Sequence, residues 1–272
     1  MTDPMSLTHA VVYVVLGFAV GAFGTLIGVG GGWLLAPILV FLHPYEPAIS
    51  LTAISLAVVC VNAASGSFAY ARMGRVDFRA ALAFSAAGLP GSILGAWATR
   101  FVDRRIFDPL LGGVLVLGSL AMLVSHAGDA SVAAERATRT LIEKDGTVHH
   151  YRPRIRLGML LSVGIGFVSS LLGIGGGILH VPAMVYVLGF PTHIATATSH
   201  AALAVLSLSA VLVHAADGTL RPVLMRVIPI LVGVLPGAQL GARLSSALKD
   251  RWILRALAIA LLAVGVRLLW AR

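Results

Sequence analysis

The chain has 272 residues, of which 58% are apolar and 11% charged, and a formal net charge of +9. Soluble domains are about 45–50% apolar and about 25% charged, so this composition excludes an ordinary water-soluble fold. Lys and Arg stand in short clusters between apolar segments, which argues against nucleic-acid binding, and the single Cys60 excludes an intrachain disulfide.

Eight apolar segments are long enough to cross a bilayer, whose hydrocarbon core requires about 20 residues of helix. No basic region precedes the first segment, so we interpret it as a retained span rather than a cleaved signal peptide. The segments cover about 9–28, 48–71, 80–99, 108–126, 157–173, 194–216, 223–243 and 252–270. The sequence therefore predicts an all-α polytopic membrane protein.

Two shorter apolar pieces, at about 32–42 and 177–189, follow the first and fifth spans across glycine runs. The runs are GVGGG at Gly28–Gly32 and GIGGG at Gly173–Gly177. Either a long helix is broken by the glycines, or a span is followed by a re-entrant half-helix, because irregular backbone at membrane depth must be buried or line a cavity. Both alternatives create an interior site.

A charged segment, residues 127–156, separates the apolar halves and is predicted to be an aqueous linker. Its middle has the composition of a short surface helix, and Asp145-Gly146 is typical of a turn. The predicted organisation is a first transmembrane repeat at 1–126, this linker, and a second transmembrane repeat at 157–272.

The two halves are related in sequence. GTLIGVGGGWLLAPIL from Gly24 aligns with SSLLGIGGGILHVPAM from Ser169, and TAISLA from Thr52 aligns with TATSHA from Thr196. LPGSILGA from Leu89 and LPGAQLGA from Leu235 continue the match at nearly the same offset. Internal duplication is common among transporters, whose substrate site lies between the repeats.

The distribution of basic residues gives an orientation. If each glycine-broken unit crosses the membrane once, thirteen Lys and Arg lie on the face that holds the linker and both termini, and seven lie on the other. The positive-inside rule then places the linker and termini in the cytoplasm of a cell with the protein in its inner membrane. An odd number of crossings per half would make the repeats inverted, and this alternative stays open.

The glycine runs are the first candidate substrate site. A glycine-rich break that opens a helix presents free backbone N–H groups at the positive end of the helix dipole, where an anion binds. Tight helix packing through small residues is the competing interpretation. The candidate residues are Gly30, Gly31, Gly32, Gly175, Gly176 and Gly177.

Polar side chains in the following span of each half are the second candidate. Hydroxyl and amide groups can donate to an anion, and a titratable histidine inside a span is a functional candidate by default; contacts between helices are the competing role. These residues are Thr52, Ser55 and Asn62 in the first half, and Thr196, Thr198, Ser199 and His200 in the second.

No catalytic set, metal site or cofactor site is predicted. The spans contain no pair of acidic residues, and His180, His200 and His214 are too widely spaced to form a local ligand pair. We therefore expect a protein that is not an enzyme and carries no cofactor.

The paired glycine runs, the Pro37 and Pro182 that follow them, and the repeated TAISLA/TATSHA and LPG motifs resemble the sulfite exporter TauE/SafE family of permeases from about Gly17 to Leu269. The resemblance implies transport of a small sulfur-containing anion, such as sulfite or an organosulfonate. From the duplication we expect a secondary transporter that works by alternating access around a midplane site between the repeats. An anion channel and a permease for another small anion, such as a carboxylate, stay open. The expected partners are this anion, the lipid bilayer, a coupling proton or ion if transport is inward, and no nucleic acid; a homodimer stays open.

Overall fold

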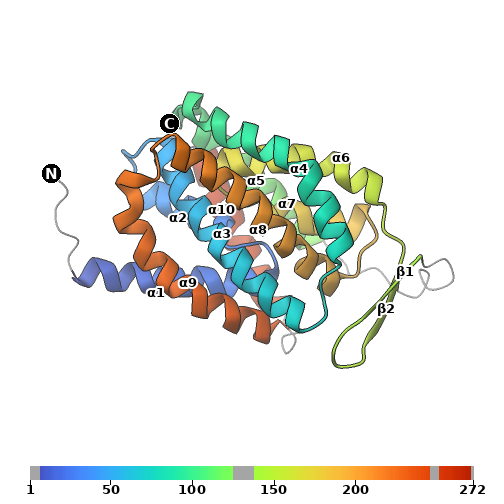
Figure 1. The fold of residues 1–272 in the computed structure, drawn as a ribbon. Coiled ribbons are helices and arrows are strands. Elements are labelled where there is room, and N and C mark those ends of the chain that lie inside the picture. The colour runs from blue at the N-terminus through green and yellow to red at the C-terminus, as the bar shows by residue number, and fades with distance from the viewer. Residues whose placement is uncertain (1–6, 125–137, 246–250, 271–272) are drawn as a thin grey trace.

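The computed structural model describes residues 7–124, 138–245 and 251–270, which fold into a helical bundle with one β-hairpin (Figure 1). The first half contains α1 (Leu7–Ile27), α2 (Gly32–Leu42), α3 (Ala48–Arg72), α4 (Phe78–Ala98), a 3-10 turn (Thr99–Phe101) and α5 (Arg104–Val124). The linker forms β1 (Arg139–Ile142) and β2 (Val148–Tyr151). The second half contains α6 (Ile155–Leu172), α7 (Gly177–Pro182), a π-helical turn (Ala183–Val187), α8 (Thr192–Ala216), a 3-10 turn (Arg221–Val223), α9 (Leu224–Leu244) and α10 (Arg251–Trp270).

Several helices have the length and composition of membrane spans. In the described residues, six meet both criteria: α1, α3, α4 with its 3-10 turn, α6, α8 and α9 with the turn before it. Helices α5 and α10 pack against each other, and Gly112 approaches Gly265 in this contact. The chain is therefore a multi-pass helical membrane protein, whereas the predicted count of eight spans is not established.

The two glycine-broken units are hairpins. Helices α1 and α2 are antiparallel, because the Tyr13 hydroxyl lies 3.1 Å from His43 Nε2 at one end and Gly24 lies beside Gly31 at the other. The second unit, α6 and α7 with its π-helical turn, is also antiparallel. The Arg154 amide donates to the Leu188 carbonyl at 3.0 Å at its open end, and Gly176 contacts Ser169 at its closed end. Each unit ends on the face where it began, so the assumption of one net crossing per unit is wrong.

As a consequence, corresponding helices of the two halves run in opposite directions. Helix α3 is antiparallel to its counterpart α8, because Leu56 packs with Ala210 near one end and Tyr70 with His200 near the other. Arg267 of α10 lies over Phe41 of α2, 4.7 Å from the ring centre, so the end of α10 shares the face of His43. The β-hairpin lies at the opposite end of the bundle (Figure 1), which contradicts the shared face expected for linker and termini.

Close packing between halves depends on glycine. Helices α1 and α9 run side by side, and a Cβ at Gly233 would lie 1.9 Å from the Val14 carbonyl oxygen. The counterpart pair α4 and α6 is similar, with Gly91 against the Val163 carbonyl. Small residues allow helix backbones to approach closely in membranes, and here they join each half to the other.

The described part of the linker is a β-hairpin rather than the predicted surface helix. Arg139 pairs with Tyr151 in an antiparallel register. The predicted turn at Asp145-Gly146 is present: Gly146 has a φ of 89°, and Asp145 Oδ1 accepts from the Thr147 amide at 2.9 Å. Residues 127–137 of the predicted linker lie outside the described residues.

Candidate functional site

The two glycine breaks meet at the centre of the bundle. A Cβ at Gly32 would lie 2.8 Å from the carbonyl of Ile174, and one at Gly177 would lie 2.3 Å from the Val29 carbonyl oxygen. Only glycine permits this crossing of backbone on backbone. The packing interpretation therefore holds for Gly32 and Gly177, which join the breaks to each other.

Each break also contacts the polar opening of the long helix from the opposite half. Gly28 lies against the Thr196 side chain, and Gly173 lies against Thr52. The Ser55 hydroxyl donates to the Gly173 carbonyl at 2.5 Å. Thr52, Ser55 and Thr196 therefore lie against the glycine run of the opposite half.

The first break holds a polar cluster around Asn62, which is fully buried. The Thr25 hydroxyl donates to Asn62 Oδ1 at 2.9 Å, and the Tyr70 hydroxyl donates to the Thr25 carbonyl at 2.6 Å. Within the part of the chain that the structure describes, these contacts leave Asn62 Nδ2 as a buried donor without a hydrogen-bond partner. Asn62 Nδ2 would lie 3.1 Å from a Cβ atom placed on Gly24 and 3.3 Å from one placed on Gly31, so the amide nitrogen faces the glycine backbone.

Helix α2 begins beside this amide. Its N-cap is Gly31, which has a φ of 75° and offers no side-chain cap. The Leu34 and Leu35 amides bind the Gly31 carbonyl, but within the described chain the Trp33 amide has no backbone acceptor. The buried indole N–H of Trp33 is also unpaired. Uncapped N–H groups carry a partial positive charge at a helix start, so the Asn62 amide and the backbone at the start of α2 both offer neutral donors to this break.

His200 lies on the other side of the cluster. Its fully buried ring stands edge-on to Tyr70, with ring centres 5.6 Å apart, and contacts Gly66. The backbone of Gly28 and Thr196 faces the ring, yet neither ring nitrogen makes a hydrogen bond of normal geometry with any described residue. Thr52 Oγ1 and Ser199 Oγ are also buried without a partner.

The second break has different chemistry. Ser170 occupies the position that aligns with Thr25, and its hydroxyl lies 2.8 Å from that of Ser92, which donates to the Leu206 carbonyl at 2.7 Å. Leu206 aligns with Asn62, so the free amide has no counterpart there. Helix α7 is only six residues long before the π-helical turn. The two breaks are alike in backbone and unlike in side chains.

The structure brings most of the predicted residues together, with some in other roles. Gly30 and Gly175 pack on Leu203 and Val59. Thr198 is turned toward the linker face, where its hydroxyl accepts from the Asp77 amide at 3.0 Å. The sequence reasoning missed Thr25, Trp33 and Tyr70, although a hydroxyl at the aligned positions Thr25 and Ser170 was a usable signal.

The fold and this duplicated core agree with the comparison to known proteins. The sequence matches the family described as Sulfite exporter TauE/SafE over residues 13–268. The chain belongs to this family. It is 30% identical over 268 residues to the probable membrane transporter protein YunE of Bacillus subtilis, covering 96% of this chain and 97% of the relative.

Other relatives of this TauE/SafE protein carry the same kind of name. A probable membrane transporter protein of Xylella fastidiosa (strain Temecula1) is 27% identical, with 94% of this chain and 91% of the relative covered. The probable membrane transporter protein YjnA of Bacillus subtilis is 24% identical, with coverage of 94% and 98%. No solved structure matches. The chain is thus a membrane transporter and not an enzyme, and these names give no substrate.

The linker hairpin of this TauE/SafE protein covers one end of the site. Asp77, in the loop before α4, binds Arg139 of β1 and accepts from the Tyr151 hydroxyl at 2.8 Å. Burial raises the pKa of the Tyr151 phenol above its ordinary value, and the bond to Asp77 raises it further, so the hydroxyl remains a donor. Because Asp77 also binds Thr198 on α8, the hairpin fixes the α3–α4 loop onto α8.

A buried ion pair adds to this cover. Arg75 Nε lies 2.5 Å from Glu143 Oε2, and His149 Nε2 lies 2.8 Å from the other oxygen of the same carboxylate. Cavities of about 680 and 400 Å³ open near the hairpin, and none of the predicted site residues lines them. The polar cluster at the first break is therefore closed off from both of these openings.

Proposed function

We propose that this protein is a secondary transporter that carries a small sulfur-containing oxyanion, such as sulfite or an organosulfonate, across the cell inner membrane. The anion binds at the first glycine break between α1 and α2. One observation carries the proposal: Asn62 Nδ2 is a fully buried donor that faces the uncapped start of α2 and has no hydrogen-bond partner among the described residues.

The donors at this break suit an oxyanion. A sulfite or sulfonate group has three oxygens, each able to accept hydrogen bonds, and burial without a partner costs each donor about 1–3 kcal/mol. Asn62 Nδ2 and the Trp33 amide supply such donors without a full positive charge. Neutral donors bind a weakly basic anion without a buried ion pair, whose desolvation cost is large. The family name supports sulfur over the carboxylate alternative.

The helix directions support alternating access. Each half contributes one re-entrant hairpin and three further helices, and corresponding helices run oppositely, which is the arrangement of inverted repeats. We assign residues 1–126 and 157–272 to these repeats. Rocking of one repeat against the other opens a central site to each face in turn, with the crossing of Val29 and Ile174 near the pivot.

The burial of the proposed site residues favours a carrier over a channel. Ser55, Asn62, Ser199 and His200 are fully buried, so an anion reaches them only after a conformational change. A channel requires a continuous wet path through its conducting state. The ion pairs of the hairpin with Arg75 and Asp77 are the contacts that opening toward the linker face breaks.

The linker face is cytoplasmic in this proposal. Eleven described Lys and Arg residues lie on it and six on the opposite face, which satisfies the positive-inside rule. The eleven are Arg72, Arg75, Arg79, Arg139, Lys144, Arg152, Arg154, Arg156, Arg243, Arg251 and Arg255, and the six are Arg100, Arg104, Arg105, Arg221, Arg226 and Arg267. Export of an anion then follows the inside-negative potential, at about 2.3 kcal/mol per charge per 100 mV, and needs no coupling ion.

A thermal-shift screen tests the substrate class. Purified protein is heated with sulfite, sulfate, an organosulfonate or a small carboxylate, because a ligand that binds only the folded state raises the apparent Tm. We expect sulfite or the sulfonate to raise it and the carboxylate to leave it unchanged. Stabilisation by the carboxylate alone would replace the proposed substrate class with the competing one.

A further inference from the structure

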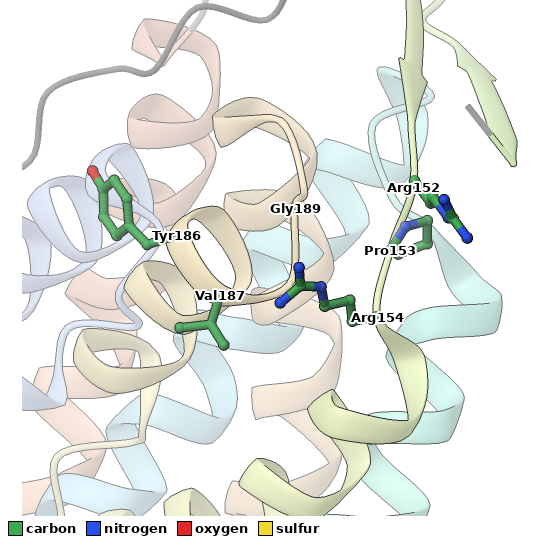
Figure 2. A pocket seen from close by; sticks show the side chains of 6 residues that line it. All are labelled: Arg152, Pro153, Arg154, Tyr186, Val187 and Gly189. Atoms are coloured by element: carbon green, nitrogen blue, oxygen red, sulfur yellow. The ribbon is translucent and has the colours of Figure 1, made fainter. Parts of the chain in front are cut away.

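A basic cavity lies at the linker face, away from the glycine breaks. A cavity of about 680 Å³ is lined by Arg152, Pro153, Arg154, Tyr186, Val187 and Gly189. Figure 2 shows Arg154 extending toward Val187 and Gly189, whereas Arg152 points to the other side of its strand. The cavity thus has one arginine directed inward and a second at its rim.

The two walls of this cavity are held together by backbone contacts. The Arg154 amide donates to the Leu188 carbonyl at 3.0 Å. Gly189 has a φ of 77°, and a Cβ there would lie 3.2 Å from the Arg152 carbonyl oxygen. Arg154 is also the N-cap of α6. The backbone that carries Arg154 is therefore held in place on both walls of the cavity.

The arginines carry uncompensated charge. Both side chains are exposed, no acidic residue lines the cavity, and neither guanidinium has an ion-pair partner in the described part of the chain. A planar guanidinium donates two parallel hydrogen bonds to a phosphate, which makes arginine well suited to this group. The cavity is therefore complementary to a phosphate-bearing anion.

The surroundings indicate that the anion is a lipid headgroup. Tyr186 and Val187 are 51% and 42% exposed at the cavity. Helix α6, which begins beside Arg154, exposes an apolar series as it enters the bilayer: Met159, Leu160, Val163 and Phe167. A headgroup at Arg154 would thus have an apolar helix face beside its acyl chains, and basic pockets on the cytoplasmic side of membrane proteins bind anionic lipids.

We propose that Arg154, with Arg152 at the rim, binds the phosphate of an anionic phospholipid in the leaflet at the linker face. The site is independent of the transported anion, because its residues are separate from the glycine breaks. It anchors the second re-entrant hairpin, through Tyr186 and Val187, to the membrane surface.

Native mass spectrometry of the full-length protein in detergent tests this site. Phosphatidylglycerol is the anionic probe and phosphatidylcholine is the zwitterionic control. We expect Arg154→Gln to weaken phosphatidylglycerol binding about tenfold or more, since it removes a charge-assisted hydrogen bond, and Arg152→Gln to weaken it less. Arg156→Gln is the matched control, because Arg156 is exposed on the same segment and does not line the cavity.

Three results would overturn the proposal. One is equal phosphatidylglycerol binding by the native protein and Arg154→Gln. Another is equal loss in Arg156→Gln, which would indicate diffuse attraction to a basic surface. The third is full competition by millimolar inorganic phosphate, which would identify a soluble anion as the ligand. Apparent Tm without lipid separates these results from misfolding, and we expect it to be the same in all variants.

Discussion

The Thr25 hydroxyl donates to Asn62 Oδ1 at 2.9 Å, inside the first glycine break. In this arrangement the amide oxygen is used by Thr25, and within the described chain the amide nitrogen has no partner. Thr25 itself is held by Tyr70, whose hydroxyl donates to the Thr25 carbonyl. The orientation of the proposed anion donor therefore depends on a residue that does not touch the anion.

Thr25→Val keeps the shape of the side chain and removes the hydrogen bond to Asn62. We expect sulfite affinity to fall by about fivefold to tenfold, corresponding to a neutral hydrogen bond of about 1 kcal/mol or slightly more. Thr25→Ser keeps the hydroxyl and should retain most of the affinity. Titration calorimetry measures both, and unchanged affinity in Thr25→Val would show that the amide needs no such support.

His200 is fully buried against Tyr70 and Gly66, with both ring nitrogens unpaired. If it donates to the anion, His200→Gln retains a donor and partial transport, whereas His200→Leu loses more. If its protonation is coupled to transport, the pH dependence of transport becomes flat in both variants. Flux assays in proteoliposomes as a function of pH test this, and a normal rate and pH profile in His200→Leu would show that His200 is a packing residue.

Two glycines of α6 provide a matched test of the interface between α4 and α6. A Cβ at Gly166 would lie 2.6 Å from the Gly88 carbonyl oxygen, whereas one at Gly164 would have nothing within 4 Å. Gly166→Ala should lower the free energy of unfolding by about 1–3 kcal/mol, because the added methyl group overpacks the interface. Gly164→Ala should leave the free energy of unfolding unchanged or raise it by up to about 1 kcal/mol, because alanine has the higher helix propensity. Apparent Tm in detergent measures both, and equal values would mean that the helices do not pack this closely.

Single cysteines test whether the two halves have opposite orientations in the membrane. In a Cys60→Ala background, Thr147→Cys places a thiol on the exposed tip of the β-hairpin, and Ala216→Cys places one at the exposed end of α8. Inverted halves put these positions on opposite faces. An impermeant thiol reagent on intact cells should therefore label Ala216→Cys and spare Thr147→Cys. Protection or labelling of both would favour the parallel arrangement, with one crossing per glycine-broken unit.

The sequence was sufficient for the parts of the fold that depend on composition and repetition. Membrane insertion, the family and the central position of the glycine runs all follow from local pattern, and the structure and comparisons agree with them. The direction of α2 relative to α1 could not be predicted from the sequence, because after a glycine break the chain can continue in the same direction or reverse. Tyr13 and His43 decide it through a contact across 30 residues.

The candidate site was predictable in its residue types but not in its pairing. Thr196 was assigned to the second half, where the alignment places it, yet it packs on Gly28 of the first. Such exchange between halves is a property of their packing, which no local pattern encodes. The β-hairpin was missed for a similar reason, since buried partners such as Arg75 and Asp77 stabilise short polar strands that have little preference of their own.

Counterflow of labelled sulfite in proteoliposomes, compared between the native protein and Asn62→Leu, tests anion transport at the first break most directly. Leucine is the residue that the second half carries at the aligned position, Leu206; the apparent Tm of the variant is measured alongside, because the Thr25 hydroxyl loses its acceptor. We expect saturable counterflow in the native protein, and affinity reduced by about tenfold to a hundredfold in Asn62→Leu through loss of a hydrogen bond to a charged group. Native counterflow in Asn62→Leu, or a flux linear in sulfite concentration without counterflow, would contradict a carrier with its site at Asn62.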